Sequence, residues 1–257
     1  MQLRAHAKIN WALRVTGKRS DGYHDIETLF QTISLYDTIT IEPAPTLSLT
    51  CSDPTIPVDD TNLVMGAAKA AGVPGRIHLE KRIPAGGGLG GGSSDGAAIL
   101  KYAQCFDVDV AAKLGSDVPF FLDGGTQYAS GKGEVLTRLP RVAPVPLLLV
   151  FPDERVATAA AYASLRRFSP PLGIDRYRAM IADDLLAHAG ELVNDFEDAV
   201  FAKLPHLRAI KTKLYEHGAA WAAMTGSGST MVAAFRSQAA RDAAAAQFPG
   251  AASCETI

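Results

Sequence analysis

The sequence predicts a mixed α+β protein of two domains. Its 257 residues suffice for one large domain or two moderate ones. Strand-like alternation and helical periodicity both occur, and helical patterns dominate the second half. A proline-bearing stretch, Pro140–Pro146, separates the halves. We therefore expect domains at 1–143 and 144–257, an arrangement that allows the last residues to pack back on the first domain.

Composition and charge exclude several classes of protein. Hydrophobic residues make up 47% and charged residues 20%, unlike disordered, collagen-like or coiled-coil chains. A net charge of 25 − 27 = −2 argues against a nucleic-acid or membrane binder. Three scattered cysteines indicate neither a zinc site nor a disulfide framework. With no signal peptide and no apolar stretch longer than Val145–Phe151, we expect a cytoplasmic protein.

Alternation and helix-breaking residues define the elements of the first half. Residues Leu3–Val15 alternate between apolar and polar, which predicts a strand with one buried face; Lys8 and Asn10 share its polar side. Gly72 and Pro74 end a helical pattern. The other elements expected here are strands at Thr38–Glu42 and Arg76–Ile83, helices at Asn62–Ala71 and from about Ser93, and a hairpin of Thr126–Ser130 with Glu134–Leu139.

The second half begins with a short continuous apolar run, Val145–Phe151, which predicts a buried strand. The loop Gly226–Ser229 separates two further apolar runs, which predicts a strand-loop-strand unit. The remaining elements expected here are strands at Ala219–Thr225 and Thr230–Phe235, and helices at Ala157–Arg167, Tyr177–Ala189, Phe196–Lys203, His206–Glu216 and Arg241–Gln247.

The segment Pro84–Asp95 joins a predicted strand to a predicted helix through six glycines between Gly86 and Gly92. Glycine lets the backbone approach a ligand closely and adopt positive φ. The start of the following helix offers unpaired N–H groups and positive potential. Together these features predict a cradle for the phosphates of a nucleotide. The alternative is a flexible linker in which Ser93 or Ser94 caps the helix.

Two better-known phosphate loops fit this segment poorly. The pattern G-x-x-x-x-G-K-[ST] does not occur. Gly86, Gly88 and Gly91 satisfy G-x-G-x-x-G, with Asp107 and Asp109 about twenty residues on. A glycine-saturated string meets that pattern by chance, however. A dinucleotide-binding first strand is also continuously apolar, whereas the strand predicted before this loop alternates.

The loop instead resembles the phosphate loop of the galactokinase, homoserine kinase, mevalonate kinase and phosphomevalonate kinase (GHMP) superfamily. Met224–Thr230 resembles the second glycine-rich motif of that superfamily, and Ala7–Asn10 resembles its first motif. Other segments narrow the resemblance to the branch that phosphorylates a cytidine-diphosphate-linked methylerythritol, and the motifs follow the family's order over almost the whole chain. These segments are Asp21–His24, Leu114–Phe120, Val156–Tyr162 and Asn194–Glu197.

This resemblance implies a two-domain α+β GHMP-kinase fold, with a ribosomal-protein-S5-domain-2-like N-terminal domain and a ferredoxin-like C-terminal domain. It implies transfer of the ATP γ-phosphoryl to the 2-hydroxyl of that small-molecule substrate, in the non-mevalonate route to isoprenoid precursors. ATP and Mg²⁺ are the implied cofactors, and no protein ligand for Mg²⁺ can be named. No nucleic-acid or membrane partner is expected, and the protein is a monomer or a homodimer.

The resemblance also assigns roles to residues of this chain. Asp117 matches the family's catalytic aspartate, Lys8 matches the lysine beside it, and Asn10 lies on the same strand face. The alternative for Asp117 is a loop or capping residue, and for Lys8 an exposed strand lysine. The expected nucleotide-binding residues are Asn62, Pro84, Gly86, Gly87, Gly88, Leu89, Gly90, Gly91, Gly92, Ser93 and Ser94.

The cytidine end of the substrate needs an apolar slot with hydrogen-bonding edges. His24 matches a position that pairs with the base, and Tyr162 matches one that stacks on it. Phe30 is alternatively a core residue, Tyr162 a residue packed on its helix, and Asn62 an N-cap. The full set of expected substrate-binding residues is Tyr23, His24, Phe30, Thr158, Tyr162, Gly226 and Ser227.

One segment departs from the family pattern. Between Ser94 and Asp117 the chain is shorter than the resemblance implies, where a helix, a loop and a second helix lead to the catalytic aspartate. This leaves open a catalytically weakened nucleotide-binding protein. A homoserine or mevalonate type of GHMP kinase and a dinucleotide-dependent oxidoreductase also stay open as interpretations of the sequence.

Overall fold

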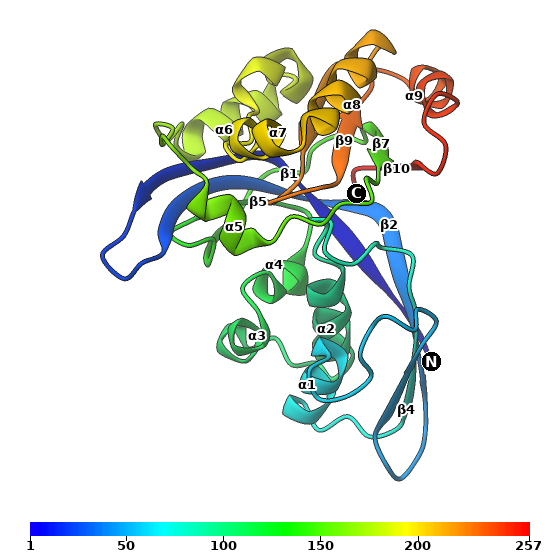
Figure 1. Ribbon diagram of the computed structural model, residues 1–257. Helices are drawn as coiled ribbons and strands as arrows, with labels where there is room; N and C mark the ends of the chain where they lie inside the picture. The colour runs from blue at the N-terminus through cyan, green and yellow to red at the C-terminus, as the bar shows by residue number, and fades with distance from the viewer. The chain divides into compact units, whose positions relative to one another are not determined.

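The computed structural model describes all 257 residues, which form two compact units (Figure 1). Strands β1 (Gln2–Lys18) and β2 (His24–Glu42) contribute residues to both units, so the units interleave along the sequence. The division at residues 143 and 144 therefore stays a prediction. The first unit comprises Met1–Lys8, Leu35–Ala85 and Gly90–Gly124, and the second comprises Ile9–Ser34, Gly86–Leu89 and Gly125–Ile257.

The first unit combines a small sheet with four helices. Strand β4 (Arg76–Glu80) pairs antiparallel with the end of β2 and parallel with β3 (Ser48–Cys51). Its side chains are buried and exposed in strict alternation, as the sequence predicted. The helices pack against one another along the chain: α1 (Leu63–Ala70), α2 (Gly91–Tyr102), α3 (Val108–Leu114) and α4 (Val118–Asp123).

Strand β1 corrects the expectation of one buried face. Every residue from Ala7 to Val15 is buried, including Lys8, Asn10 and Arg14 on the polar side. Such burial is tolerated because each polar side chain has partners. The guanidinium of Arg14, for example, donates to the Glu191 carbonyl at 2.9 Å. The alternation of apolar and polar residues therefore reflects an apolar face and a polar face of β1, and both faces are buried in the protein.

The second unit contains a four-stranded antiparallel sheet in the order β10-β7-β9-β8. Numbered along this part of the chain, that order is fourth, first, third, second. The helices α8 (Pro205–Glu216) and α9 (Gln238–Ala245) lie in its two crossover connections and pack on the sheet (Figure 1). This β-α-β-β-α-β pattern is the expected ferredoxin-like domain. The strands are β7 (Pro146–Val150), β8 (Trp221–Met224), β9 (Met231–Ala234) and β10 (Ala252–Glu255).

The last residues of the chain pair with β2 in the second unit. The Ile257 N–H donates to the Thr32 carbonyl at 3.1 Å, and the Gln31 side chain donates to the Ile257 carbonyl at 2.9 Å. The predicted hairpin is also present, as β5 (Thr126–Ser130) and β6 (Val135–Arg138), and β5 pairs with β2.

Two helices predicted in the second half differ markedly from the structure in length or continuity, and α9 begins at Gln238 rather than at Arg241. The first is shorter, because α5 spans only Thr158–Ala163. The second is broken into α6 (Ile174–Ala182) and the 3₁₀ helix η1 (Leu185–Glu191). The break has a local cause: Asp183 leaves helical geometry, and the Asp184 carboxylate caps the new helix by accepting from the Leu186 N–H at 3.0 Å. Helix α7 (Glu197–Lys203) follows as expected.

Candidate active site

The glycine loop between β4 and α2 uses positive φ at alternate glycines. The φ values are +76° at Gly86, +80° at Gly88 and +70° at Gly90, a region that other residues rarely occupy. A Cβ on Gly88 would lie 2.2 Å from the Thr225 carbonyl oxygen. Glycine at this position therefore allows the first glycine loop to contact the second one, residues 225–229.

The second glycine loop is held by the amides of two buried asparagines. Asn10 on β1 accepts from the Gly226 N–H at 3.0 Å, and its amide nitrogen donates to Thr28 Oγ1 at 2.7 Å. Asn194 donates to the carbonyls of Met224 at 2.6 Å and Gly226 at 2.9 Å. The amide of Asn10 is thus committed to positioning the loop, and its expected catalytic role stays a prediction.

Asn194 is a residue to which sequence reasoning gave no role, although it opens the motif Asn194–Glu197. Its amide oxygen accepts from the Phe196 N–H at 3.0 Å, which fixes the turn before α7. The only sequence signal was the motif itself. Its partners lie about thirty residues away in the second glycine loop, and no local pattern identifies them.

Lys8 and Asp117 meet within the first unit. Lys8 Nζ lies 3.8 Å from Asp117 Oδ2, with the lysine side chain 4% exposed and the aspartate side chain 36% exposed. Burial lowers the pKa of Lys8, and the nearby charge of Asp117 partly opposes that effect. The alternative of an exposed strand lysine is therefore wrong.

Asp117 occupies the N-cap position of α4, yet its side chain makes no capping hydrogen bond. The capping alternative thus describes its backbone position but not its side-chain contacts. Because the carboxylate is not used by the helix and remains partly exposed, it is available to a ligand while it faces Lys8.

The start of α2 packs closely on the same group. A Cβ on Gly90 would lie 2.8 Å from the ring of Phe121 on α4 and 3.2 Å from Lys8 Cγ. Gly90 is the N-cap of α2, so the expectation that the helix begins near Ser93 is wrong by two residues, and neither Ser93 nor Ser94 caps it. Ser94 instead donates its hydroxyl to the His6 carbonyl at 2.6 Å.

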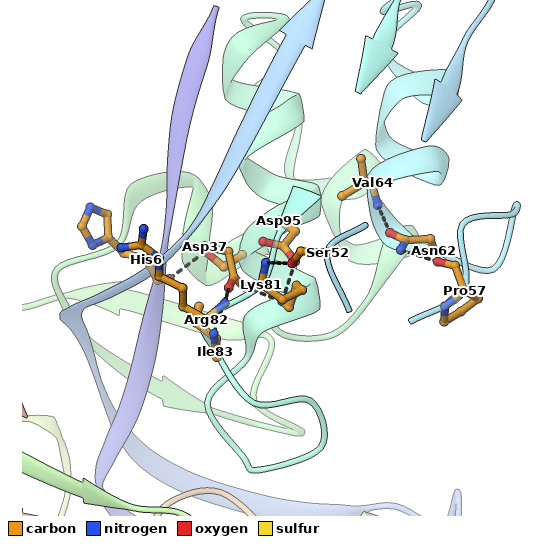
Figure 2. A network of polar contacts seen from close by, with 11 residues as sticks. His6, Asp37, Ser52, Pro57, Asn62, Val64, Lys81, Arg82, Ile83 and Asp95 are labelled. Carbon is orange, nitrogen blue, oxygen red and sulfur yellow. Dashed lines mark hydrogen bonds and ion pairs between the residues drawn. The ribbon is translucent and has the colours of Figure 1, made fainter. Parts of the chain in front are cut away.

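A buried network that sequence reasoning missed joins the end of the β4 segment to α2 in the first unit (Figure 2). Lys81 forms ion pairs with Asp37 on β2 and with Asp95 on α2, the latter at 2.9 Å. Asp37 also accepts from the N–H groups of Arg82 at 2.5 Å and Ile83 at 2.8 Å. Lys81 therefore ties the residues before the loop to the helix that follows it.

Asp95 is the least satisfied member of this network. Its Oδ1 is buried without a hydrogen-bond partner. Burial raises the pKa of Asp95 to about 7, the charge of Asp37 adds to the increase, and Lys81 opposes it. The network thus contains two carboxylates and one ammonium, all of them buried.

Asn62 is the N-cap of α1, as the alternative interpretation predicted. Its Oδ1 accepts from the Val64 N–H at 2.9 Å, and its Nδ2 donates to the Pro57 carbonyl at 2.7 Å (Figure 2). Both ends of the amide are therefore used by the fold. A contact of Asn62 with a nucleotide stays a prediction.

Two of the expected cytidine-binding residues come together in the second unit. The rings of His24 and Tyr162 are stacked, with centroids 4.9 Å apart at an interplanar angle of 22°. Tyr162 also packs edge-on against Phe196 at 4.8 Å. The pair presents a flat aromatic and imidazole surface from residues that are 138 positions apart in the sequence.

The remaining substrate residues that we expected behave differently. Thr158 Oγ1 lies 2.9 Å from Ser227 Oγ, so those two are brought together. Tyr23 is 60% exposed, and Lys132 Nζ lies 4.7 Å from its ring centroid. Phe30 is buried within β2, which is the core placement weighed as its alternative.

The shortened segment before Asp117 keeps two helices. Helix α2 ends at Tyr102, and α3 begins after Asp107, whose carboxylate accepts from the N–H groups of Asp109 at 2.8 Å and Val110 at 3.2 Å. Asp107 is therefore the N-cap of α3, and Asp109 lies in its first turn. The short connection still places Asp117 beside Lys8.

No group of three or more His, Cys, Asp or Glu side chains is arranged to hold a metal ion. No helix is long and apolar enough to cross a membrane.

Comparison with known proteins gives a consistent result. The family described as GHMP kinases N terminal domain matches residues 62–125, and GHMP kinases C terminal matches residues 179–253. A 4-diphosphocytidyl-2-C-methyl-D-erythritol kinase of Chlorobium chlorochromatii is 42% identical over 97% of this chain and 93% of its own length. One of Salinibacter ruber is 42% identical over 93% of this chain and 92% of its own length.

A solved structure agrees with these relatives. The crystal structure of a 4-(cytidine 5'-diphospho)-2C-methyl-D-erythritol kinase matches with a TM-score of 0.85 and 35% identity. The match covers 100% of this chain and 99% of that one.

The raised pKa of Asp95 predicts a pH-dependent stability. Between pH about 4 and about 7 the folded state binds a proton that the unfolded state has lost, so stability falls as the pH rises through this window. The side chain of Asp95→Asn cannot ionise, so the free energy of unfolding of this variant should fall less steeply with pH. The slopes of wild type and variant should differ by up to about 1.4 kcal/mol per pH unit. Chemical denaturation at pH 5 to 8 measures this, with Asp109→Asn as the control. Identical slopes for wild type and Asp95→Asn would contradict it.

Proposed function

Because this chain belongs to the 4-diphosphocytidyl-2-C-methyl-D-erythritol kinase family of GHMP kinases, we propose that it phosphorylates that compound. ATP gives its γ-phosphoryl group to the 2-hydroxyl, and the products are the 2-phosphate and ADP. This places the protein in the non-mevalonate route to isopentenyl diphosphate. The single observation that carries the chemistry is the pairing of an accessible carboxylate, Asp117, with a buried ammonium, Lys8.

Asp117 is the proposed acceptor of the hydroxyl proton. In the transfer, the 2-hydroxyl oxygen forms a bond to the γ-phosphorus while the bond from that phosphorus to the ADP oxygen breaks. The hydroxyl proton passes to the Asp117 carboxylate. Its partial exposure and freedom from capping support this role, because a carboxylate bonded to its own helix would be a poorer acceptor.

Lys8 supplies positive charge beside that carboxylate. Burial limits the screening of this charge by water, so its field acts strongly on the negative charge that develops as the hydroxyl is deprotonated. The Lys8 side chain passes close to Gly90, the N-cap of α2, where a Cβ would lie 3.2 Å from Lys8 Cγ.

The glycine loop is the proposed site for the polyphosphate of ATP, where backbone N–H groups and the start of α2 receive the negative charge. Mg²⁺ would be carried on the phosphates and water, since it rarely uses an all-protein cage and the chain offers none. When bound, the ion neutralises phosphate charge. The expected roles of the remaining loop residues are part of this proposal.

The stacked pair His24–Tyr162 is the proposed base-binding element. A cytosine ring would stack on this pair of rings. The imidazole of His24 would be available to hydrogen-bond with the edge of the base. Thr158 and Ser227 add neighbouring hydroxyls in the same unit. Homoserine and mevalonate contain no nucleobase, so this element favours the cytidylyl compound over them as the acceptor substrate.

We also infer a cytoplasmic location and a monomer or homodimer. The location is supported by three cysteines that remain free thiols.

Asp117→Asn should lower kcat by roughly 10²–10⁴, because the variant loses the proton acceptor. ATP affinity should be unchanged. Steady-state phosphoryl transfer from ATP to 4-diphosphocytidyl-2-C-methyl-D-erythritol measures kcat, and Asp109→Asn on α3 is the matched control. Turnover close to wild type would remove Asp117 from the reaction. If the protein turned over only homoserine or mevalonate, the proposed cytidylyl substrate would be wrong.

Tyr162→Ala should raise KM for the cytidylyl substrate by about tenfold, the loss expected for one base–aromatic stack. KM for ATP should stay unchanged. Tyr162→Phe keeps the ring and should remain near wild type, which separates stacking from the hydroxyl. An unchanged KM in Tyr162→Ala, with a normal melting temperature, would exclude Tyr162 as a substrate contact.

A further inference from the structure

Arg155 lies against the first glycine loop. It sits in the connection between β7 and α5, and its side chain is exposed. A Cβ on Gly86 would lie 3.5 Å from Arg155 Cδ and 3.9 Å from its Nε. The arginine stem therefore covers the face of Gly86 that positive φ and the missing side chain leave open.

The backbone around Arg155 is fixed to the second glycine loop. The Ser229 hydroxyl donates to the Glu154 carbonyl, immediately before Arg155. Three residues after it, Thr158 Oγ1 lies 2.9 Å from Ser227 Oγ. Because the two glycine loops touch at Gly88 and Thr225, Arg155 is anchored where they meet. All of these residues belong to the second unit.

The charge of Arg155 is not neutralised by the protein. No carboxylate oxygen lies within 4.0 Å of its guanidinium nitrogens. The neighbouring carboxylate of Glu154 pairs instead with His206 at 3.0 Å. Several surface arginines of the chain do have carboxylate partners, for example Arg19, Arg167 and Arg236. The guanidinium of Arg155 therefore lies beside the first glycine loop with no carboxylate partner, and it is available to bind an anionic ligand.

We propose that Arg155 binds the polyphosphate of the donor nucleotide at the glycine loop. A guanidinium donates two parallel hydrogen bonds to phosphate oxygens and stays charged at any physiological pH. It adds a side-chain cation to the backbone N–H groups of the loop. This inference rests on the proposed function only in taking the loop's ligand to be ATP.

The test is nucleotide binding without the acceptor. Isothermal titration calorimetry with the β,γ-imido analogue of ATP and Mg²⁺ should show Kd raised about tenfold in Arg155→Gln, as expected when one charge-assisted hydrogen bond is lost. Arg155→Lys keeps the positive charge but loses the planar guanidinium that donates two parallel hydrogen bonds. Its Kd should therefore lie between those of wild type and Arg155→Gln. The matched control is Arg166→Gln, at another exposed arginine just after α5, and it should bind the nucleotide like wild type.

A second titration separates the two phosphate-bearing ligands. The cytidylyl substrate also contains a diphosphate, and its Kd should be unchanged in Arg155→Gln. An unchanged nucleotide Kd would overturn the proposal, as would a rise in the Kd of the cytidylyl substrate alone. If the wild type fails to phosphorylate the cytidylyl substrate, the proposed function is wrong, yet the nucleotide titration still decides the role of Arg155.

Discussion

Strand β1 buries three polar side chains, and the need to satisfy each of them organises much of the structure. Lys8 faces Asp117 in the first unit. Asn10 holds the second glycine loop, and Arg14 donates to the carbonyls of Glu191 and Pro170 in the second unit. Buried polar groups without partners are costly. Satisfying them therefore fixes where segments more than a hundred residues away along the chain must lie.

The distribution of cations explains how a chain of net charge −2 can receive a polyphosphate. Lys81 lies close to the start of α2, but two carboxylates neutralise it, so it serves the loop as an anchor. Lys8 places its positive charge in a buried position beside Asp117, the proposed proton acceptor. Arg155 is exposed and uncommitted. The positive electrostatic field is thus produced by a few local groups, and the net charge of the whole chain does not reveal it.

Several local parts of the fold were predictable from the sequence, although β3, α4 and the part of β2 before Thr38 were not predicted. The cap at Asn62, the hairpin at β5 and β6, and the alternation of β4 follow from patterns spanning only a few residues. The failures have two causes: a local choice between continuing a helix and capping a new one, and contacts with residues distant in the sequence. The break between α6 and η1 depends on an aspartate that caps a new helix instead of continuing the old one. The double burial of β1 depends on partners that no window of β1 contains.

The sequence by itself determined that a glycine cradle precedes a helix, that Lys8 and Asn10 share one strand face, and which family motifs the chain carries. Only the tertiary structure decided what these residues do to one another. It commits Asn10 to the second glycine loop, buries Lys8 beside an uncapped Asp117, and sets Arg155 over Gly86. The physical reason is that spacing fixes direction along an element, whereas charge, burial and hydrogen bonding depend on neighbours that folding brings from elsewhere in the chain.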